Sequence, residues 1–159
     1  MSEPSDEARA AAQRALAAEH AAVYGYGVVG ARARGGRAAE ARAGYDAHRA
    51  RRDALSRVVR DLGDPPQPAA AAYALPFAVP DEAAAVRLAT ELEDRIAGSY
   101  ADLVRAADGD LRRDAAAALR EAAVRAARWR GGSVAFPGLA ERTPDTAPAG
   151  RQDGAGRQD

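Results

Sequence analysis

The sequence predicts an all-α protein that folds as a four-helix bundle, and three observations lead to this expectation. Four long stretches lack proline and are rich in alanine, arginine, glutamate and leucine, the residues with the highest helix propensity. Within each stretch, apolar and small residues recur at intervals of three and four positions, which places them on one helical face. Glycines or a proline-rich segment separate the stretches, and both interrupt helices.

The composition excludes several classes of function. The chain has 159 residues, enough for one domain with a modest core. Its 23 basic residues, all arginine, equal its 23 acidic residues, which argues against a dedicated nucleic-acid partner. Without cysteine there can be no disulfide, thiolate catalysis or cysteine-ligated metal. The acidic amino terminus does not resemble a signal peptide, and the longest apolar runs are too short to cross a bilayer, so we expect a cytoplasmic protein without a membrane partner.

The first two helices are bounded by glycines. We expect the first over residues 6–34, because Ser5 is a suitable N-cap and acidic residues follow it in the first turn. Gly35 is expected to end this helix. The second helix is expected over residues 37–62, with Gly63 as its stop.

The last two helices follow the same pattern. The third is expected over residues 81–107, with Asp81 as its cap and Gly109 as its end. The fourth is expected over residues 110–130 and stops at Gly131.

The bundle is expected to occupy residues 1–140. Residues 141–159 are dominated by threonine, proline, glycine, glutamine and aspartate, a composition that cannot bury enough apolar surface to fold. We therefore expect a disordered carboxy-terminal tail over 141–159.

The lengths of the links predict the topology. Short links join helices 1 and 2 and helices 3 and 4, so each pair should be antiparallel. The link from Gly63 to Pro80 has eighteen residues and five prolines. In extended polyproline form it reaches about 56 Å, more than the roughly 39 Å length of the second helix. We therefore expect a long crossover between helices 2 and 3, the ferritin-like arrangement. Alternation of Tyr73, Leu75, Phe77 and Val79 predicts that the link lies half-buried along the bundle.

Three ionisable residues interrupt the apolar faces of three different helices: Glu19, His48 and Glu93. Buried charge is costly unless it is paired or bound to a metal. Arg52 lies one turn beyond His48 on the same face. The first interpretation is therefore a buried, hydrogen-bonded salt network of Glu19, His48, Arg52 and Glu93, in which replacement of Arg52 would be strongly destabilising.

Three segments resemble a known bacterial family. They are Leu16-Ala-Ala-Glu-His-Ala-Ala-Val-Tyr-Gly-Tyr-Gly, Tyr45-Asp-Ala-His-Arg-Ala-Arg-Arg-Asp and Tyr73-Ala-Leu-Pro-Phe. Together they resemble the ferritin-like family called domain of unknown function 4439, over about residues 10–139. The resemblance implies a ferritin-like four-helix bundle without an assigned activity.

A metal site is the alternative interpretation of the same residues. Ferritin-like di-iron sites use one Glu from each of two helices and a Glu-x-x-His pair from each of the other two. Tyr45 and Val124 stand where a Glu and a His of that pattern are expected, so the site is degenerate. The residues left to bind iron or manganese are Glu19, His48, Glu93 and Glu121. A single metal on Glu19, His48 and Glu93 is a further possibility.

Three classes of function remain open at this point. The first is a non-enzymatic structural or protein-interaction module, and the second is a metal-binding protein or oxidoreductase. The third is a small-molecule binder whose pocket is lined by Tyr26, Tyr45 and Tyr100. Glycines are costly inside a helix, so those of the first helix predict close approach of another backbone, within the bundle or in a homodimer: Gly25, Gly27 and Gly30. We expect a homodimer.

Overall fold

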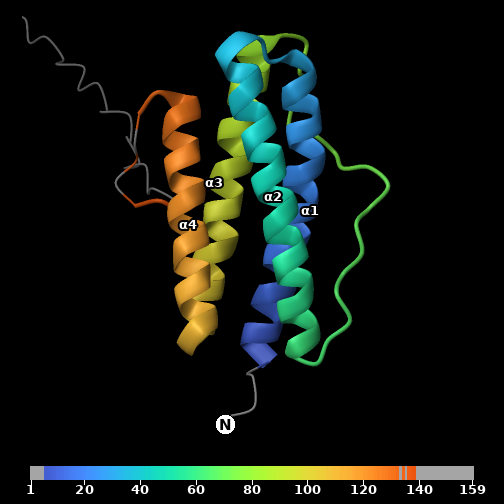
Figure 1. Ribbon diagram of the computed structural model, residues 1–159, viewed down its shortest axis with the longest axis vertical. Coiled ribbons are helices and arrows are strands. Elements are labelled where there is room, and N and C mark those ends of the chain that lie inside the picture. The colour runs from blue at the N-terminus through green and yellow to red at the C-terminus, as the bar shows by residue number, and fades with distance from the viewer. Residues whose placement is uncertain (1–5, 133, 135, 139–159) are drawn as a thin grey trace, which may run out of the picture.

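The described residues form four long helices, as expected for an all-α four-helix bundle (Figure 1). The computed structural model describes residues 6–132, 134 and 136–138. The helices are α1 (Asp6–Arg32), α2 (Gly35–Asp61), α3 (Glu82–Ala106) and α4 (Gly109–Arg130). The predicted tail over 141–159 lies outside the described residues. Within the described ranges, no helix has the length and apolarity needed to cross a membrane.

Two glycines begin helices that they were expected to precede. Gly35 and Gly109 are the first residues of α2 and α4, with φ angles of 51° and 55°. Each follows a residue in extended conformation, Arg34 or Asp108. Glycine adopts a positive φ without a steric penalty, which allows the chain to reverse direction in a very short link. The predicted ends of the first and third helices were therefore too late.

Other helix boundaries follow ordinary capping chemistry. The side chain of Asp81 accepts a hydrogen bond from the backbone N–H of Ala84 at 2.8 Å, so Asp81 caps α3 as expected. Gly131 ends α4 in the left-handed conformation with φ of 80°.

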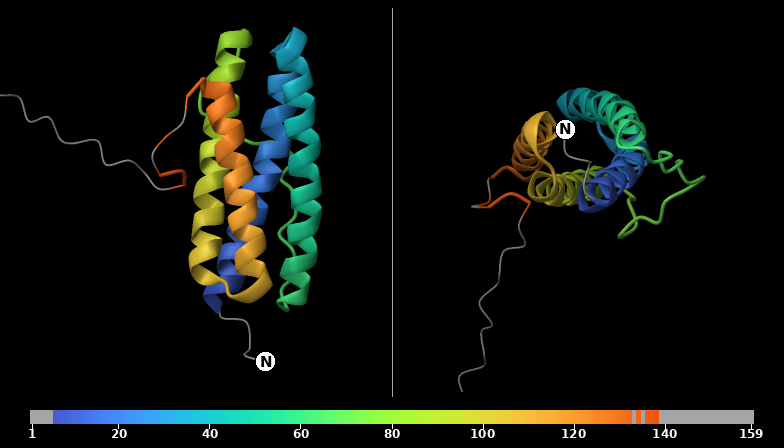
Figure 2. Two further views of the ribbon diagram at one scale, coloured as in Figure 1. Left: turned by 60° about the vertical axis from the view of Figure 1, so that its left-hand side comes forward. Right: turned by 90° about the horizontal axis from the view of Figure 1, so that it is seen from below.

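The four helices form an arc rather than a closed square. Seen along the bundle, their order is α2, α1, α3 and α4, and the packed neighbours are α1 with α2, α1 with α3, and α3 with α4 (Figure 2). The two helices at the ends of the arc, α2 and α4, meet through long side chains. The guanidinium of Arg51 contacts Glu121 at 2.7 Å, and Arg37 donates to the carbonyl oxygen of Arg128 at 3.3 Å.

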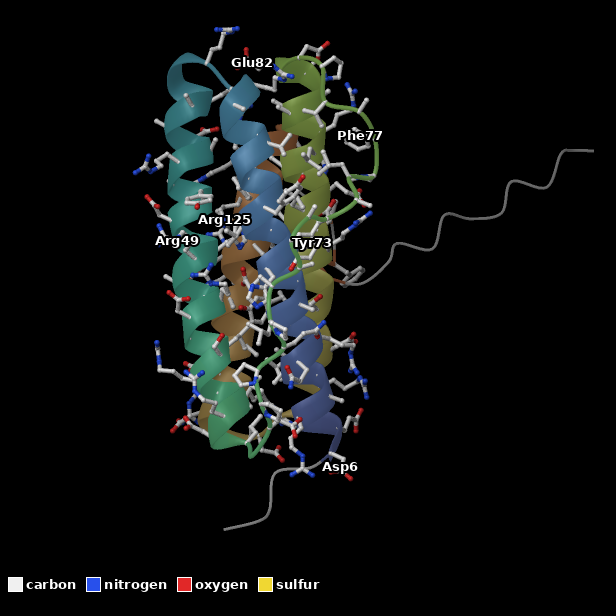
Figure 3. All side chains as sticks on the ribbon, turned by 90° about the vertical axis from the view of Figure 1, so that its right-hand side faces the viewer. Asp6, Arg49, Tyr73, Phe77, Glu82 and Arg125 are labelled. Carbon is white, nitrogen blue, oxygen red and sulfur yellow. The ribbon has the colours of Figure 1, made fainter. Side chains whose placement is uncertain are left out.

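The segment between α2 and α3 runs along α1 (Figures 1 and 3). Near the start of α1, the side chain of Gln13 donates to the carbonyl oxygen of Pro65 at 2.8 Å. At the end of α1, Arg32 donates to the carbonyl oxygen of Val79 at 3.1 Å. The link therefore spans most of the length of α1. The alternating residues Tyr73, Leu75, Phe77 and Val79 are half-buried, while their neighbours in the link are exposed.

The core consists of two apolar clusters along the bundle axis. One contains Leu16, Leu55, Ile96 and Leu103 together with many alanines. The other contains the large side chains Tyr26, Val29, Leu88, Leu92 and Trp129. Along α3, Glu93 lies between Leu92 of the second cluster and Ile96 of the first, and on α1 Glu19 lies near the end of the first cluster, before Ala22 and then Tyr26 of the second. A polar layer therefore lies in the middle of the bundle.

Candidate functional site

A histidine between two carboxylates forms the centre of the polar layer. Glu19 of α1, His48 of α2 and Glu93 of α3 are each 0% exposed. The Nδ1 atom of His48 is 2.7 Å from Oε2 of Glu19, and its Nε2 atom is 2.9 Å from Oε1 of Glu93. The structure thus brings together three residues that the sequence places on three different helices.

The geometry makes His48 a cation. An ionised carboxylate can only accept hydrogen bonds, so both ring nitrogens of His48 must donate, as they do in the imidazolium form. Burial alone would lower the pKa of His48, but the hydrogen bonds and negative charges of Glu19 and Glu93 raise it to about 9. Burial alone would raise the pKa of Glu93, but the hydrogen bond and charge of His48 and the charge of Arg125 lower it.

A fourth charged residue enters from α4. The Nε atom of Arg125 donates to Oε1 of Glu93 at 2.9 Å, and the side chain of Arg125 is only 20% exposed. Glu19 and Glu93 supply two negative charges, and His48 and Arg125 supply two positive charges. The cluster of these four residues, the buried ion cluster, is therefore neutral, and each helix contributes one member.

Aromatic donors extend the cluster in both directions. The hydroxyl of Tyr100 donates to Oε1 of Glu19 at 2.7 Å, and that of Tyr26 donates to Oε1 of Glu93 at 2.6 Å. The indole N–H of Trp129 donates to the hydroxyl oxygen of Tyr26 at 2.9 Å. Burial and a neighbouring carboxylate raise the pKa of both tyrosines, so both remain protonated donors. A continuous chain of hydrogen bonds therefore runs from Trp129 through His48 to Tyr100.

Two buried glycines create the space that this arrangement needs. A Cβ atom on Gly44 would lie 2.3 Å from the ring of Tyr26, and one on Gly25 would lie 2.5 Å from Leu92. Gly44 therefore allows the Tyr26 ring to reach Glu93. Gly25 was expected to allow close approach of a backbone, but it makes room for a side chain instead.

Arg52 was expected in the network, and the structure places it elsewhere. Its guanidinium contacts the exposed carboxylate of Asp53 at 2.8 Å. Positions 51 and 52 lie on either side of the buried stripe that passes through His48 and Leu55, so their long side chains can reach the surface. Arg125 supplies the second positive charge in place of Arg52.

Sequence reasoning missed Arg125, although a signal for it existed. The buried stripe of α4 steps through Ala115, Ala118, Ala122, Ala126 and Trp129. Arg125 lies directly beside this stripe, three residues after Ala122 and four before Trp129, and is partly buried. An arginine at the edge of an alanine stripe, in a bundle with two buried carboxylates, is the pattern that could have identified it.

The donor set does not fit a di-iron centre or a single metal. The two ring nitrogens of a histidine point in diverging directions, so Glu19 and Glu93 lie on opposite sides of His48 and do not converge with it on one point. Glu121 is exposed and paired with Arg51. Across the part of the chain that the structure describes, no group of three or more His, Cys, Asp or Glu residues could hold a metal ion.

The expected tyrosine pocket is also not formed. Tyr26 and Tyr100 are buried, and their hydroxyls are bound to the glutamates. Tyr100 lines a small cavity with Leu103, whereas Tyr45 lines a separate groove on the outer side of α1. The three tyrosines therefore lie in different environments and do not line one pocket.

One oxygen of the cluster has no partner. Three donors converge on Oε1 of Glu93, while its Oε2 atom is buried and accepts no hydrogen bond from any described residue. Buried polar atoms of this kind are commonly satisfied by ordered water.

Residues 11–141 match the family described as domain of unknown function (DUF4439). The chain belongs to this family. The matched range includes every member of the buried ion cluster and both tyrosines bound to it. This confirms the family expected from the three sequence segments, and the family's description names no activity.

One solved structure supports the same relationship. It is the crystal structure of a conserved hypothetical protein, Rv2844, from Mycobacterium tuberculosis, with 38% sequence identity and a TM-score of 0.77. The similarity covers 80% of this chain and 98% of that chain. No curated protein matches the chain.

Proposed function

We propose that this protein is a non-enzymatic, metal-independent helical-bundle module with a structural or protein-interaction role. The observation that supports this most directly is the position of His48, whose two ring nitrogens are bound by carboxylates on opposite sides. A cytoplasmic location and the lack of a nucleic-acid partner are part of the proposal. The equal numbers of basic and acidic residues, 23 each, support the second of these.

The chemistry of the cluster supports a structural role over a catalytic one. A histidine that ligates a metal or accepts a proton needs a ring nitrogen with a free lone pair. In the imidazolium form of His48, both nitrogens already carry protons directed at Glu19 and Glu93. The hydroxyls of Tyr26 and Tyr100 are similarly used within the protein.

The cluster would specify how the helices align. A shift of one helix by one turn, about 5.4 Å, would break several hydrogen bonds at once and leave buried charges unpaired. Alanine-rich helix faces offer few large side chains that distinguish one alignment from another. The polar layer would therefore fix the alignment of the helices along the bundle axis, which the alanines alone do not fix.

Metal analysis tests this proposal. Protein purified without chelators should carry less than about a tenth of an equivalent of Fe, Mn or Zn, because Glu19, His48 and Glu93 do not converge on one point. Addition of Mn(II), Fe(II) or Zn(II) should leave the melting temperature unchanged.

A His48→Gln variant serves as the matched comparison. It should be less stable than the wild type, with no difference in metal content. Stoichiometric metal in the wild type that is lost in His48→Gln would contradict the proposal and favour the metal-binding alternative.

The homodimer is the second part of the proposal, and the outer side of α1 is the candidate surface. Gly27 and Gly30 are exposed, and a Cβ atom at either position would have no neighbour within 4 Å. The fold itself therefore does not explain these two costly glycines. Beside them, Tyr24 is 38% exposed. Tyr24 and Gly27 line one groove with Tyr45 of α2, and such a groove could receive the same surface of a second copy across a twofold axis.

A further inference from the structure

The helices at the ends of the arc are α2 and α4 (Figure 2). A cavity of about 180 Å³ is lined by residues of these two helices. Among the described residues, Arg125 is the only member of the buried ion cluster that lines it, and the outer side of α1 contributes nothing to it. Its lining residues are Glu40, Ala43 and Gly44 of α2, and Arg125, Arg128 and Trp129 of α4. Figure 3 labels Arg125, which belongs to α4.

The charges around the cavity do not cancel. Glu40 is paired with Arg37 at 2.7 Å, and Arg125 is paired with Glu93 at 2.9 Å. The side chain of Arg128 makes no hydrogen bond or ion pair within the described ranges. One positive charge is therefore left over at the wall of the cavity.

The guanidinium of Arg125 is only partly used. Its Nε atom binds Glu93, and its two terminal nitrogens make no hydrogen bond to any residue that the structure describes. The ion pair with Glu93 holds this side chain in place. A planar guanidinium fixed in this way is suited to two parallel hydrogen bonds with a carboxylate.

The remaining walls are apolar and fixed in position. Ala43 and Gly44 offer no polar side chain, and the ring of Trp129 is held by its hydrogen bond to Tyr26. The guanidinium of Arg37 lies over the same ring at 4.9 Å from its centre. A ligand in the cavity would therefore combine one anionic group with a small apolar body.

We propose that the cavity between α2 and α4 binds a small organic carboxylate through Arg125 and Arg128. An engineered apolar cavity of about 150 Å³ holds one benzene molecule, so this cavity accepts a ligand of about one ring. One carboxylate would neutralise the charge left over at Arg128.

Benzoate is the probe, and benzamide is its uncharged control of nearly the same shape. The chain has a single tryptophan, Trp129, so its fluorescence reports directly on the cavity. Titration of the full-length protein, followed by fluorescence and calorimetry, should show saturable one-to-one binding of benzoate. Benzamide should bind at least about tenfold more weakly, because it lacks the charge.

Three variants locate the binding. Arg128→Gln removes the unpaired charge, and Ala43→Leu fills the cavity without changing any charge. Both should weaken benzoate binding at least about tenfold. Arg120→Gln removes the same charge from an exposed position beside Val124, outside the cavity, and should leave binding unchanged.

Two results would overturn the proposal. One is wild-type protein that does not bind benzoate, or binds benzamide equally well. The other is benzoate binding that persists unchanged in both Arg128→Gln and Ala43→Leu.

Discussion

At the scale of single residues, His48 is held as a cation in the interior by the carboxylates on its two sides. Burial removes the imidazolium and the carboxylates from water. One carboxylate alone would therefore compensate poorly for the hydration that the imidazolium loses. The other polar groups that donate hydrogen bonds to these two carboxylates are Arg125, Tyr26 and Tyr100. The sequence identified Glu19, His48 and Glu93 because charged residues on an apolar helix face are unusual, and the structure places all three in the same layer.

The charge of His48 predicts that stability falls at alkaline pH. The pKa of His48 is raised from 6.5 to about 9, so its contribution is fully present below pH 6.5 and is lost as pH rises through about 9. The expected loss in the free energy of unfolding is on the order of 3 kcal/mol. Denaturant titrations between pH 6 and pH 10 measure it.

The two histidines of the chain provide the control for this prediction. His48→Gln should remove the pH dependence, whereas His20→Gln should preserve it, because His20 hydrogen-bonds to the carbonyl oxygen of Gln67 in the link and not to the carboxylates that bind His48. At acidic pH the dependence of stability on pH has the opposite sign, so stability falls as pH falls. The pKa of Glu93 is lowered, so its contribution is present above its ordinary pKa and is lost as pH falls.

Arg125 and Arg52 form a second matched pair. Arg125→Leu leaves the buried Glu93 with less positive charge and should cost about 3–5 kcal/mol. Arg52→Leu removes only the surface contact with Asp53 and should change stability by less than about 1 kcal/mol. From the sequence alone, the large loss of stability was expected for the replacement of Arg52 and not for that of Arg125. Thermal unfolding of both variants decides between the two assignments, and a larger loss for Arg52→Leu would contradict the structure.

At the scale of elements, the four helices were predictable because helix propensity and apolar spacing are local properties of the chain. The glycines at the boundaries were less informative. A glycine interrupts a helical pattern whether it ends one helix or begins the next, and only the backbone angles of Gly35 and Gly109 show that they begin α2 and α4. The alternation in the link after α2 was read correctly, because Tyr73, Leu75, Phe77 and Val79 are half-buried while their neighbours are exposed.

Gly35 and Gly36 test the role of the positive φ angle at neighbouring positions. Gly35→Ala should destabilise by about 1–2 kcal/mol, because an alanine at a φ of 51° is strained. Gly36 has no positive φ, and a Cβ atom there would have open space. Gly36→Ala should therefore be neutral or stabilise by up to about 1 kcal/mol. Equal effects at the two positions, measured by chemical denaturation, would contradict this assignment.

At the scale of the whole molecule, the arrangement of the helices leaves two hollows: the cavity between α2 and α4, and the groove that α1 forms with Tyr45 of α2. The first contains Arg128 and is the site proposed for a small carboxylate. The second is the surface proposed for a second copy of the chain.

The dimer predicted on the outer side of α1 is tested by Gly27→Arg. Arginine at this exposed helical position favours the helix but fills the depression, so it should convert a dimer into a monomer. Ala116→Arg on the exposed side of α4 is the control and should remain dimeric. Sedimentation velocity measures both variants. Wild-type protein with the mass of one chain would rule out this interface at the concentrations used.

The sequence by itself determined the helices and the three ionisable residues in the core, because both depend on the order of residues along one helix. Only the tertiary structure decided that Arg125, and not Arg52, neutralises Glu93, and that Gly44 makes room for Tyr26. The physical reason is that these contacts join different helices. An arginine side chain is long and can reach several positions from one backbone site. The acidic residue with which it pairs is therefore set by the distance between helices, and not by the spacing of residues along one helix.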